Sequence, residues 1–188
     1  MEQLRKQFKT TFNISEEDWE IFSSKLEQHR FAKQQNLIRL GKTENFLSFI
    51  ESGMVRLYIP KIENDLTFGF VFKDAFVSAY DSFLTQTPTK YAIQAIQDTT
   101  VWRMTYDDLQ MVYSTTKIGN LIGRKASEEL FLIKSKRELS LLKDTAEERY
   151  INLFTERPEL FTSVPLKYIA SYIGVTPQAL SRIRKRIS

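Results

Sequence analysis

The chain changes from a strand-like to a helical pattern at about Thr105, and this change constrains the fold more than any other feature of the sequence. Over residues 29–102, short segments rich in β-branched and aromatic residues alternate with turn residues such as Gly53 and Pro60. After Thr105 the apolar residues recur at helical spacing, and no proline interrupts residues 116–143. This order predicts an α+β protein in which a β-roll (a jelly roll, or double-stranded β-helix) precedes a set of helices.

Local signals place the individual elements. Ser15, with Asp18 three residues later, should cap a helix over residues 15–28 whose apolar face holds Trp19, Phe22 and Leu26. Alternating apolar residues predict strands at Asn36–Leu40, Phe46–Ile50, Met54–Ile59, Leu66–Phe72, Tyr91–Ile96 and Thr100–Met104. Caps and prolines predict helices at Thr105–Tyr113, Thr116–Lys143 and Thr145–Thr155, a short helix from Pro165 to Gly174, and a last one opened by Thr176 and Pro177.

Helical and strand periodicity predict which apolar side chains of two further segments face the core. Ile151 and Phe154 should face inward from their helix. Phe68, Phe70 and Phe72 alternate along one strand, and we expect them in the core rather than in a base-stacking platform.

The helix over residues 116–143 carries two apolar stripes, and such a helix needs two partners. One stripe can cover the β-roll and the other can pair with a second subunit, although burial within a monomer is the alternative. The first stripe consists of Ile118, Leu121, Leu132, Leu139 and Leu142. The second consists of Ile122, Ala126, Leu130 and Ile133. We expect a homodimer in which a β-roll domain over residues 1–114 is followed by a dimerisation helix over 115–144 and a helical domain over 145–188.

Positive charge is concentrated at the C-terminal end. The chain carries +4 in total, whereas residues 164–188 carry +5 with no Asp or Glu, which leaves −1 for residues 1–163. Such a segment is the footprint expected for a polyanionic partner, although a solvated basic tail would have the same composition.

The spacing within residues 166–185 is typical of a helix-turn-helix. Counting from Leu166, Ala170 is fifth, where a small side chain lets the second helix approach, and Gly174 is ninth, where the turn needs a left-handed backbone. Thr176 can cap the second helix, and Pro177 suits its first position. The residues expected to pack the two helices together are Ile169, Ile173, Val175, Leu180 and Ile183.

One face of the second helix carries residue types that contact base edges and phosphates. The predicted DNA-binding set is Thr176, Gln178, Ser181, Arg182, Lys185 and Arg186. An ordinary pair of helices with a basic surface is the alternative.

The order of these parts resembles the Crp/Fnr family of transcription regulators over nearly the whole chain. The resemblance rests on residues 49–58 (FIESGMVRLY), which look like the family's strand–Ser-Gly–strand element, and on residues 169–185 (IASYIGVTPQALSRIRK), which are close to its DNA-binding motif. Residues 76–83 (FVSAYDSF) are similar to a subgroup common in Bacteroidetes. The resemblance implies a homodimer bound to a palindromic double-stranded DNA operator, with RNA polymerase as a further partner.

Two departures change what the resemblance implies. Members that bind cyclic nucleotides carry Gly-Glu and Arg-Ser in their phosphate cassette, where this chain has Ser78-Ala79 and Lys90-Tyr91, so we do not expect cyclic AMP to bind. The polar residues of this cassette are candidates for the pocket of another small-molecule effector, or for a cassette filled by its own side chains: Ser78, Tyr80, Ser82 and Lys90. The β-hairpin wing that follows the family's recognition helix is expected to be truncated or absent.

We expect no enzyme activity, cofactor or metal. Cysteine is absent and His29 is the only histidine, so thiolate and multi-histidine metal sites cannot form. A Ser-His-Asp triad lacks its Gly-x-Ser-x-Gly elbow. The pairs Asp107-Asp108 and Glu147-Glu148 fit the first turns of helices. Without a signal peptide or a run of about 18 apolar residues, the chain is expected to be cytoplasmic.

Two functions of different classes therefore remain. The first is a dimeric, DNA-binding transcription regulator that does not respond to cyclic AMP. The second is a sensory or protein-interaction module, similar to a cyclic nucleotide-binding domain, without productive DNA binding.

Overall fold

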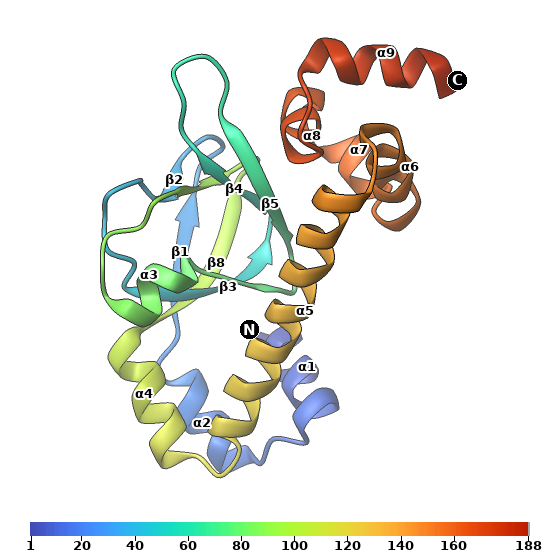
Figure 1. The fold of residues 1–188 in the computed structure, drawn as a ribbon. Coiled ribbons are helices and arrows are strands. Elements are labelled where there is room, and N and C mark those ends of the chain that lie inside the picture. Colours follow the sequence, from blue (N-terminus) through green and yellow to red (C-terminus); the bar gives the residue numbers. More distant parts are fainter. Residues whose placement is uncertain (188) are drawn as a thin grey trace.

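The computed structural model describes residues 1–187, and its centre is a β-roll of two antiparallel sheets (Figure 1). One sheet has the order β1 (Glu27–Phe31), β8 (Thr99–Thr105), β3 (Phe46–Ser52), β6 (Phe76–Val77), and the other β2 (Asn36–Ile38), β7 (Ala92–Ala95), β4 (Met54–Ile59), β5 (Leu66–Phe72). Buried apolar residues of both sheets form one cluster: Phe31, Ile38, Ile50, Val55, Val77, Ala79, Ile93, Ala95 and Val101. The expected α+β class is confirmed.

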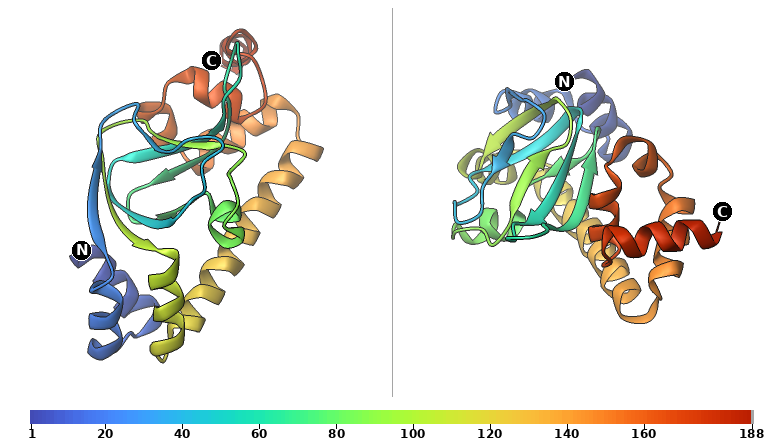
Figure 2. Two further views of the ribbon diagram at one scale, coloured as in Figure 1. Left: turned by 90° about the vertical axis from the view of Figure 1, so that its left-hand side faces the viewer. Right: turned by 90° about the horizontal axis from the view of Figure 1, so that it is seen from above.

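Helices flank the β-roll at two ends (Figures 1 and 2). They are α1 (Glu2–Phe12), α2 (Glu16–Ser23), α3 (Tyr80–Thr85), α4 (Tyr106–Thr115), α5 (Gly119–Lys143), α6 (Ala146–Glu156), α7 (Glu159–Ser163), α8 (Leu166–Tyr172) and α9 (Pro177–Ile187). Ser15 and Thr105 cap their helices through their side chains, as the sequence predicts, and Thr145 caps α6 in the same way. Within residues 1–187, no helix combines the length and apolar character that a membrane crossing requires.

Several predicted boundaries were wrong. The helix expected over residues 15–28 ends at Ser23, and the chain then enters β1 at Glu27. The long helix begins at Gly119, because Thr116 terminates α4 instead. Helix α1 was not predicted, because its buried residues Leu4 and Phe8 stand in an otherwise charged segment. Helix α7 was not predicted either. Helix α3 has only six residues.

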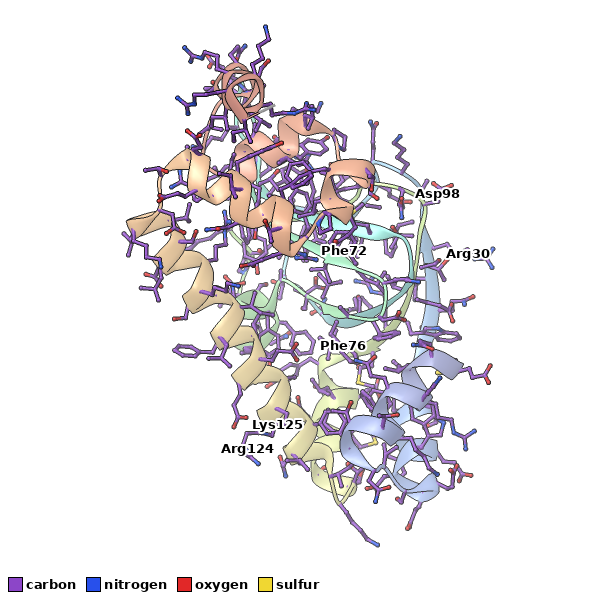
Figure 3. All side chains as sticks on the ribbon, turned by 90° about the vertical axis from the view of Figure 1, so that its right-hand side faces the viewer. Arg30, Phe72, Phe76, Asp98, Arg124 and Lys125 are labelled. Carbon is purple, nitrogen blue, oxygen red and sulfur yellow. The ribbon has the colours of Figure 1, made fainter. Side chains whose placement is uncertain are left out.

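The expectation that one stripe of α5 covers the β-roll holds only for the first part of the helix. The first part of α5, through Ile118 and Ile122, packs against a cluster that joins α1, α2 and α4 to Phe49 of β3 and Met104 of β8. Further along, residues of both stripes are exposed, with 67% of Leu132, 59% of Ile133 and 56% of Leu139 accessible. In Figure 3, Arg124 and Lys125 lie on the side of α5 away from the β-roll. Among residues 1–187, most apolar side chains of α5 beyond Ile122 are therefore left exposed.

The inward face of α6 also differs from the prediction. Ile151 and Phe154 are exposed, whereas Tyr150 and Leu153 are buried. The reason is that α7 and α8 pack against α6 one residue away from the predicted face, within a cluster that includes Leu160 and Ile169.

The C-terminal helices share their core with the outer side of the β-roll. Phe70 is buried in the cluster of α6–α9 and lies 5.2 Å, centroid to centroid, from Tyr172 of α8. Arg157 lies over the ring of Phe72, 4.6 Å from its centroid; Phe72 is labelled in Figure 3. The prediction that this strand contributes to the core was correct for Phe70, but its partners are the C-terminal helices.

Hydrogen bonds of Ser171 and the stacked guanidinium of Arg56 hold α8 against the edge of β5. The Ser171 hydroxyl accepts the backbone N–H of Thr67 and donates to the carbonyl of Asp65, both at 2.8 Å. The buried guanidinium of Arg56 stacks between the rings of Tyr58 and Tyr168, 3.9 Å from each centroid. The C-terminal helices are thus positioned by specific hydrogen bonds as well as by apolar contact.

Candidate nucleic-acid interface and effector cassette

The α8–α9 pair is formed by the turn that the sequence predicts. Gly174 has φ +78°, in the left-handed region that glycine adopts at low cost. The Thr176 hydroxyl accepts the N–H of Ala179 at 3.2 Å, which caps α9. The predicted packing residues are confirmed, because Ile169, Ile173, Leu180 and Ile183 are buried and Val175 packs against them.

Two arginines that the sequence analysis missed hold the end of α8. Arg149 of α6 donates from Nε to the carbonyl of Ile173 at 2.8 Å. Arg137 of α5 donates from Nη2 to the carbonyl of Tyr172 at 2.9 Å and lies 4.0 Å from the centroid of its ring. They satisfy carbonyls that a helix C-terminus leaves without partners. No sequence signal marks them, because the helices that carry them are far along the chain from the turn.

The outer face of α9 is basic and exposed. Gln178, Ser181, Arg182 and Lys185 are all exposed, and no residue of the described chain accepts a hydrogen bond from Arg182. In Figure 3, α9 is seen end-on and its nitrogen-tipped side chains point away from the molecule. This face offers donors and positive charge with no carboxylate of its own helix.

The other two residues of the predicted set have contacts within the chain. Thr176 is used as the helix cap. Arg186 forms an ion pair with Glu147 in the first turn of α6. The structure therefore places Gln178, Ser181, Arg182 and Lys185 together on the free face, and turns Arg186 toward α6.

The cassette residues do not converge on a cavity. The Ser78 hydroxyl donates to the carbonyl of Phe46 at 2.9 Å. Ser82 accepts the N–H of Glu44 at 3.0 Å and donates to the carbonyl of Thr87. Both serines are buried and their hydroxyls have protein partners, while Lys90 is exposed. The Tyr80 ring stacks on Phe83.

Apolar and aromatic side chains pack in the interior of the β-roll, where Val77 and Ala79 flank Ser78 of the cassette. Leu57, Val71 and Tyr91 pack against the interior cluster of the β-roll. The Tyr91 hydroxyl donates to Asp81 at 2.7 Å, and burial, followed by this carboxylate, raises the pKa of Tyr91. The phenol therefore stays neutral and holds one end of α3. This arrangement agrees with a cassette filled by its own side chains.

Two cavities lie elsewhere. One, of about 300 Å³, opens between β2, the segment 39–46 and Arg103 of β8. The other, of about 470 Å³, lies between the Ser52-Gly53 turn and α7. None of the four predicted pocket residues lines either cavity.

The carboxylate pairs and the histidine, which were weighed as enzyme groups, lie in first helical turns or are partly exposed. Asp108 and Glu148 lie in first turns and bond to the capping residues Thr105 and Thr145. His29 is partly exposed, with Nε2 3.7 Å from Glu27. Among residues 1–187, no group of three or more His, Asp or Glu side chains could hold a metal ion.

Comparison with known proteins relates the chain to one domain family and one fold. Residues 28–116 match the cyclic nucleotide-binding domain. No curated protein sequence matches the chain.

Solved structures share the fold over most of the chain. The regulator CLP of Xanthomonas campestris, described as responsive to c-di-GMP, is 16% identical with a TM-score of 0.73, over 92% of this chain and 91% of its own. FixK2 of Bradyrhizobium japonicum is 15% identical with a TM-score of 0.74, over 86% and 84%. A protein of Eubacterium rectale, described as a regulator of the Crp/Fnr family, is 14% identical with a TM-score of 0.71, over 93% and 83%.

Proposed function

We propose that this chain, which has a cyclic nucleotide-binding domain at residues 28–116 and the fold of Crp/Fnr transcription regulators, is a dimeric regulator that binds DNA through α9. The observation that carries the proposal is the face of Gln178, Ser181, Arg182 and Lys185. These donors lie on a capped, exposed helix that contains no acidic residue. Such a helix fits the major groove, where a recognition helix contacts base edges through its N-terminal part.

The positions along α9 suggest different tasks. Gln178 and Arg182 lie one helical turn apart on the exposed face, where the guanidinium fork can take O6 and N7 of one guanine. Lys185 lies toward the C-terminal end of α9, where backbone phosphates are the closer partners.

Arg182→Ala is expected to reduce sequence-specific binding by about 1–3 kcal/mol, because a bidentate base contact is lost. Lys185→Ala should weaken binding to all DNA and flatten the dependence on salt, because one phosphate contact is lost. The operator would first be selected from random duplexes, and binding to operator and scrambled DNA then measured at several salt concentrations. Arg30→Ala, which removes a cation from an exposed position on β1, serves as the matched control.

Equal losses on both duplexes with Arg182→Ala would assign Arg182 to a phosphate instead. Absence of any salt-dependent DNA binding by the unmodified protein would refute the proposal and favour the protein-interaction module.

The dimer is proposed on the uncovered apolar length of α5. Phe131, Leu132, Leu139 and Leu142 are exposed in the single chain, with 78% of Leu142 accessible. A monomer rarely leaves so many large apolar residues of one helix in water. Pairing α5 with its copy would cover them, and would present two α9 helices to half-sites about 34 Å apart on DNA.

Substitution of both Leu132 and Leu139 by Glu is expected to give monomers in sedimentation, because it places charges in the apolar interface. Lys134→Glu, on a different side of the same helix, should remain dimeric. A dimer that persists in the double variant would place the interface elsewhere.

We also propose that the cassette does not bind cyclic AMP. Its serine hydroxyls are bonded to the protein backbone, and Tyr91 is bonded to Asp81. Calorimetric titration with cyclic AMP is expected to give no saturable heat at micromolar concentrations, whereas micromolar binding would contradict this reading of the cassette.

A further inference from the structure

We propose that the cavity beneath Arg103, at the end of the β-roll, binds a small organic or inorganic anion. This cavity, of about 300 Å³, is lined by residues of β2, the segment 39–46 and β8. Its volume lies at the lower end of the range of about 300–1,000 Å³ for small-molecule sites. It contains none of the cassette residues, so the proposed ligand does not depend on the cyclic nucleotide position.

The charge of the lining favours an anion. Arg39, Lys42 and Arg103 contribute three cationic side chains, and Glu44 contributes the single carboxylate. Arg39 and Lys42 are exposed at the mouth, whereas Arg103 and Glu44 are buried deeper. A concave site with an excess of one charge, partly removed from water, attracts ions of the opposite sign.

The buried guanidinium has unused donors. Arg103 is 7% exposed, and its Nε donates to the Ser48 hydroxyl at 3.1 Å. Its Nη2 is 3.7 Å from Glu44, beyond hydrogen-bond distance, and no other acceptor among residues 1–187 takes an N–H from it. Since a guanidinium carries five N–H groups, Arg103 can still offer a two-pronged contact to a carboxylate or phosphate.

The orientation of the guanidinium is fixed before any ligand arrives. Its carbon lies 4.1 Å from the ring centroid of Phe46 and 5.5 Å from that of Phe31. Burial lowers the pKa of Arg103, and Glu44 opposes this shift, so the group remains a cation at neutral pH. A pre-oriented donor loses little conformational freedom on binding.

Glu44 is itself held by the protein. Its Oε1 accepts the N–H of Phe46 at 3.0 Å, and its Oε2 accepts that of Ala79 at 3.5 Å. The backbone of Glu44 also bonds to Ser82 and Gln86 around α3. The carboxylate therefore has its own donors when an anion occupies Arg103, and it links the cavity to the cassette.

The test is calorimetric titration of the full chain with inorganic phosphate and, separately, with succinate. At least one of the two is expected to bind saturably at low ionic strength. Arg103→Lys keeps the charge but removes the fork, and should weaken binding about tenfold or more. Because a variant at Arg103 can also disturb folding, Arg39→Gln and Lys42→Gln at the exposed mouth are measured too, with an expected loss of about two- to fivefold each.

Lys61→Gln, which removes the same charge from an exposed position outside the cavity, is the matched control. The two titrations separate a phosphate site from a carboxylate site, and binding of either supports the proposal. Absence of saturable binding for both, or equal losses in Lys42→Gln and Lys61→Gln, would overturn it. Arg182→Ala on α9 should leave the titration unchanged, so this result stands apart from the outcome of the DNA experiments.

Discussion

Gly53→Ala is expected to destabilise the protein by about 3 kcal/mol or more, because the added methyl group has no space and the backbone strains against it. Gly53 has φ +96° in the turn that leads from β3 to β4, from one sheet to the other. A Cβ there would lie 2.6 Å from the carbonyl oxygen of Asp98 and 2.6 Å from the Cα of Thr99. These are backbone atoms, which cannot rotate away.

Urea unfolding of the variant measures this effect. Gly41→Ala is the matched control, because Gly41 also has a positive φ, +79°, but a Cβ there would meet nothing within 4 Å. The free energy of unfolding of this control should fall only by the cost of the left-handed backbone, about 1–2 kcal/mol. Equal losses in the two variants would show that the Ser52-Gly53 turn can shift to accept a side chain.

Arg56→Ala is expected to lower the free energy of unfolding by about 2–3 kcal/mol and to loosen α8 from the β-roll. Arg56 is 3% exposed, and it donates to Gln94 at 2.9 Å and to Asp65 at 2.7 Å. Its removal leaves both acceptors without their cation and opens a space between Tyr58 and Tyr168. The expected loss of unfolding free energy is moderate because Asp65 is partly exposed and water can hydrate it again.

Urea unfolding and hydrogen exchange of the α8 amides would be measured together. Arg30→Ala, an exposed arginine on β1, should change the free energy of unfolding by about 0.5 kcal/mol or less. Ser171→Ala should loosen α8 in the same way, because two hydrogen bonds to the edge of β5 are lost. If α8 exchanged at the unmodified rate in both variants, apolar contact alone would hold the C-terminal helices in place.

Short-range signals determined much of this protein. The caps at Ser15, Thr105 and Thr176 could be predicted because a hydroxyl bonds to an N–H only three residues away. The turn at Gly174 could be predicted because a left-handed backbone is a property of one residue. The exposed face of α9 followed from helical spacing once Leu180 and Ile183 were assigned to the core.

Tertiary structure decided which of several equivalent faces became buried. In α6, Tyr150 with Leu153 and Ile151 with Phe154 both have the spacing of an inward face, and the position of α7 and α8 selected the first pair. In α5, both stripes have the composition of a covered face, yet most of their apolar side chains are exposed among the described residues. Periodicity identifies an apolar face but does not specify its neighbour.

The contacts that define the sites join residues that lie far apart in the sequence. Ser171 meets Thr67 across 104 positions, and Arg103 reaches Ser48 across 55. Arg149 binds a carbonyl 24 residues away to hold the turn before α9. By itself, the sequence determined the helix-turn-helix spacing and the location of its positive charge, because both depend on residues within a few turns of each other. Only the tertiary structure decided where the cavity under Arg103 lies and which residues hold α8 against β5. The reason is that packing brings hydrogen-bonding and charged groups together whatever their separation along the chain.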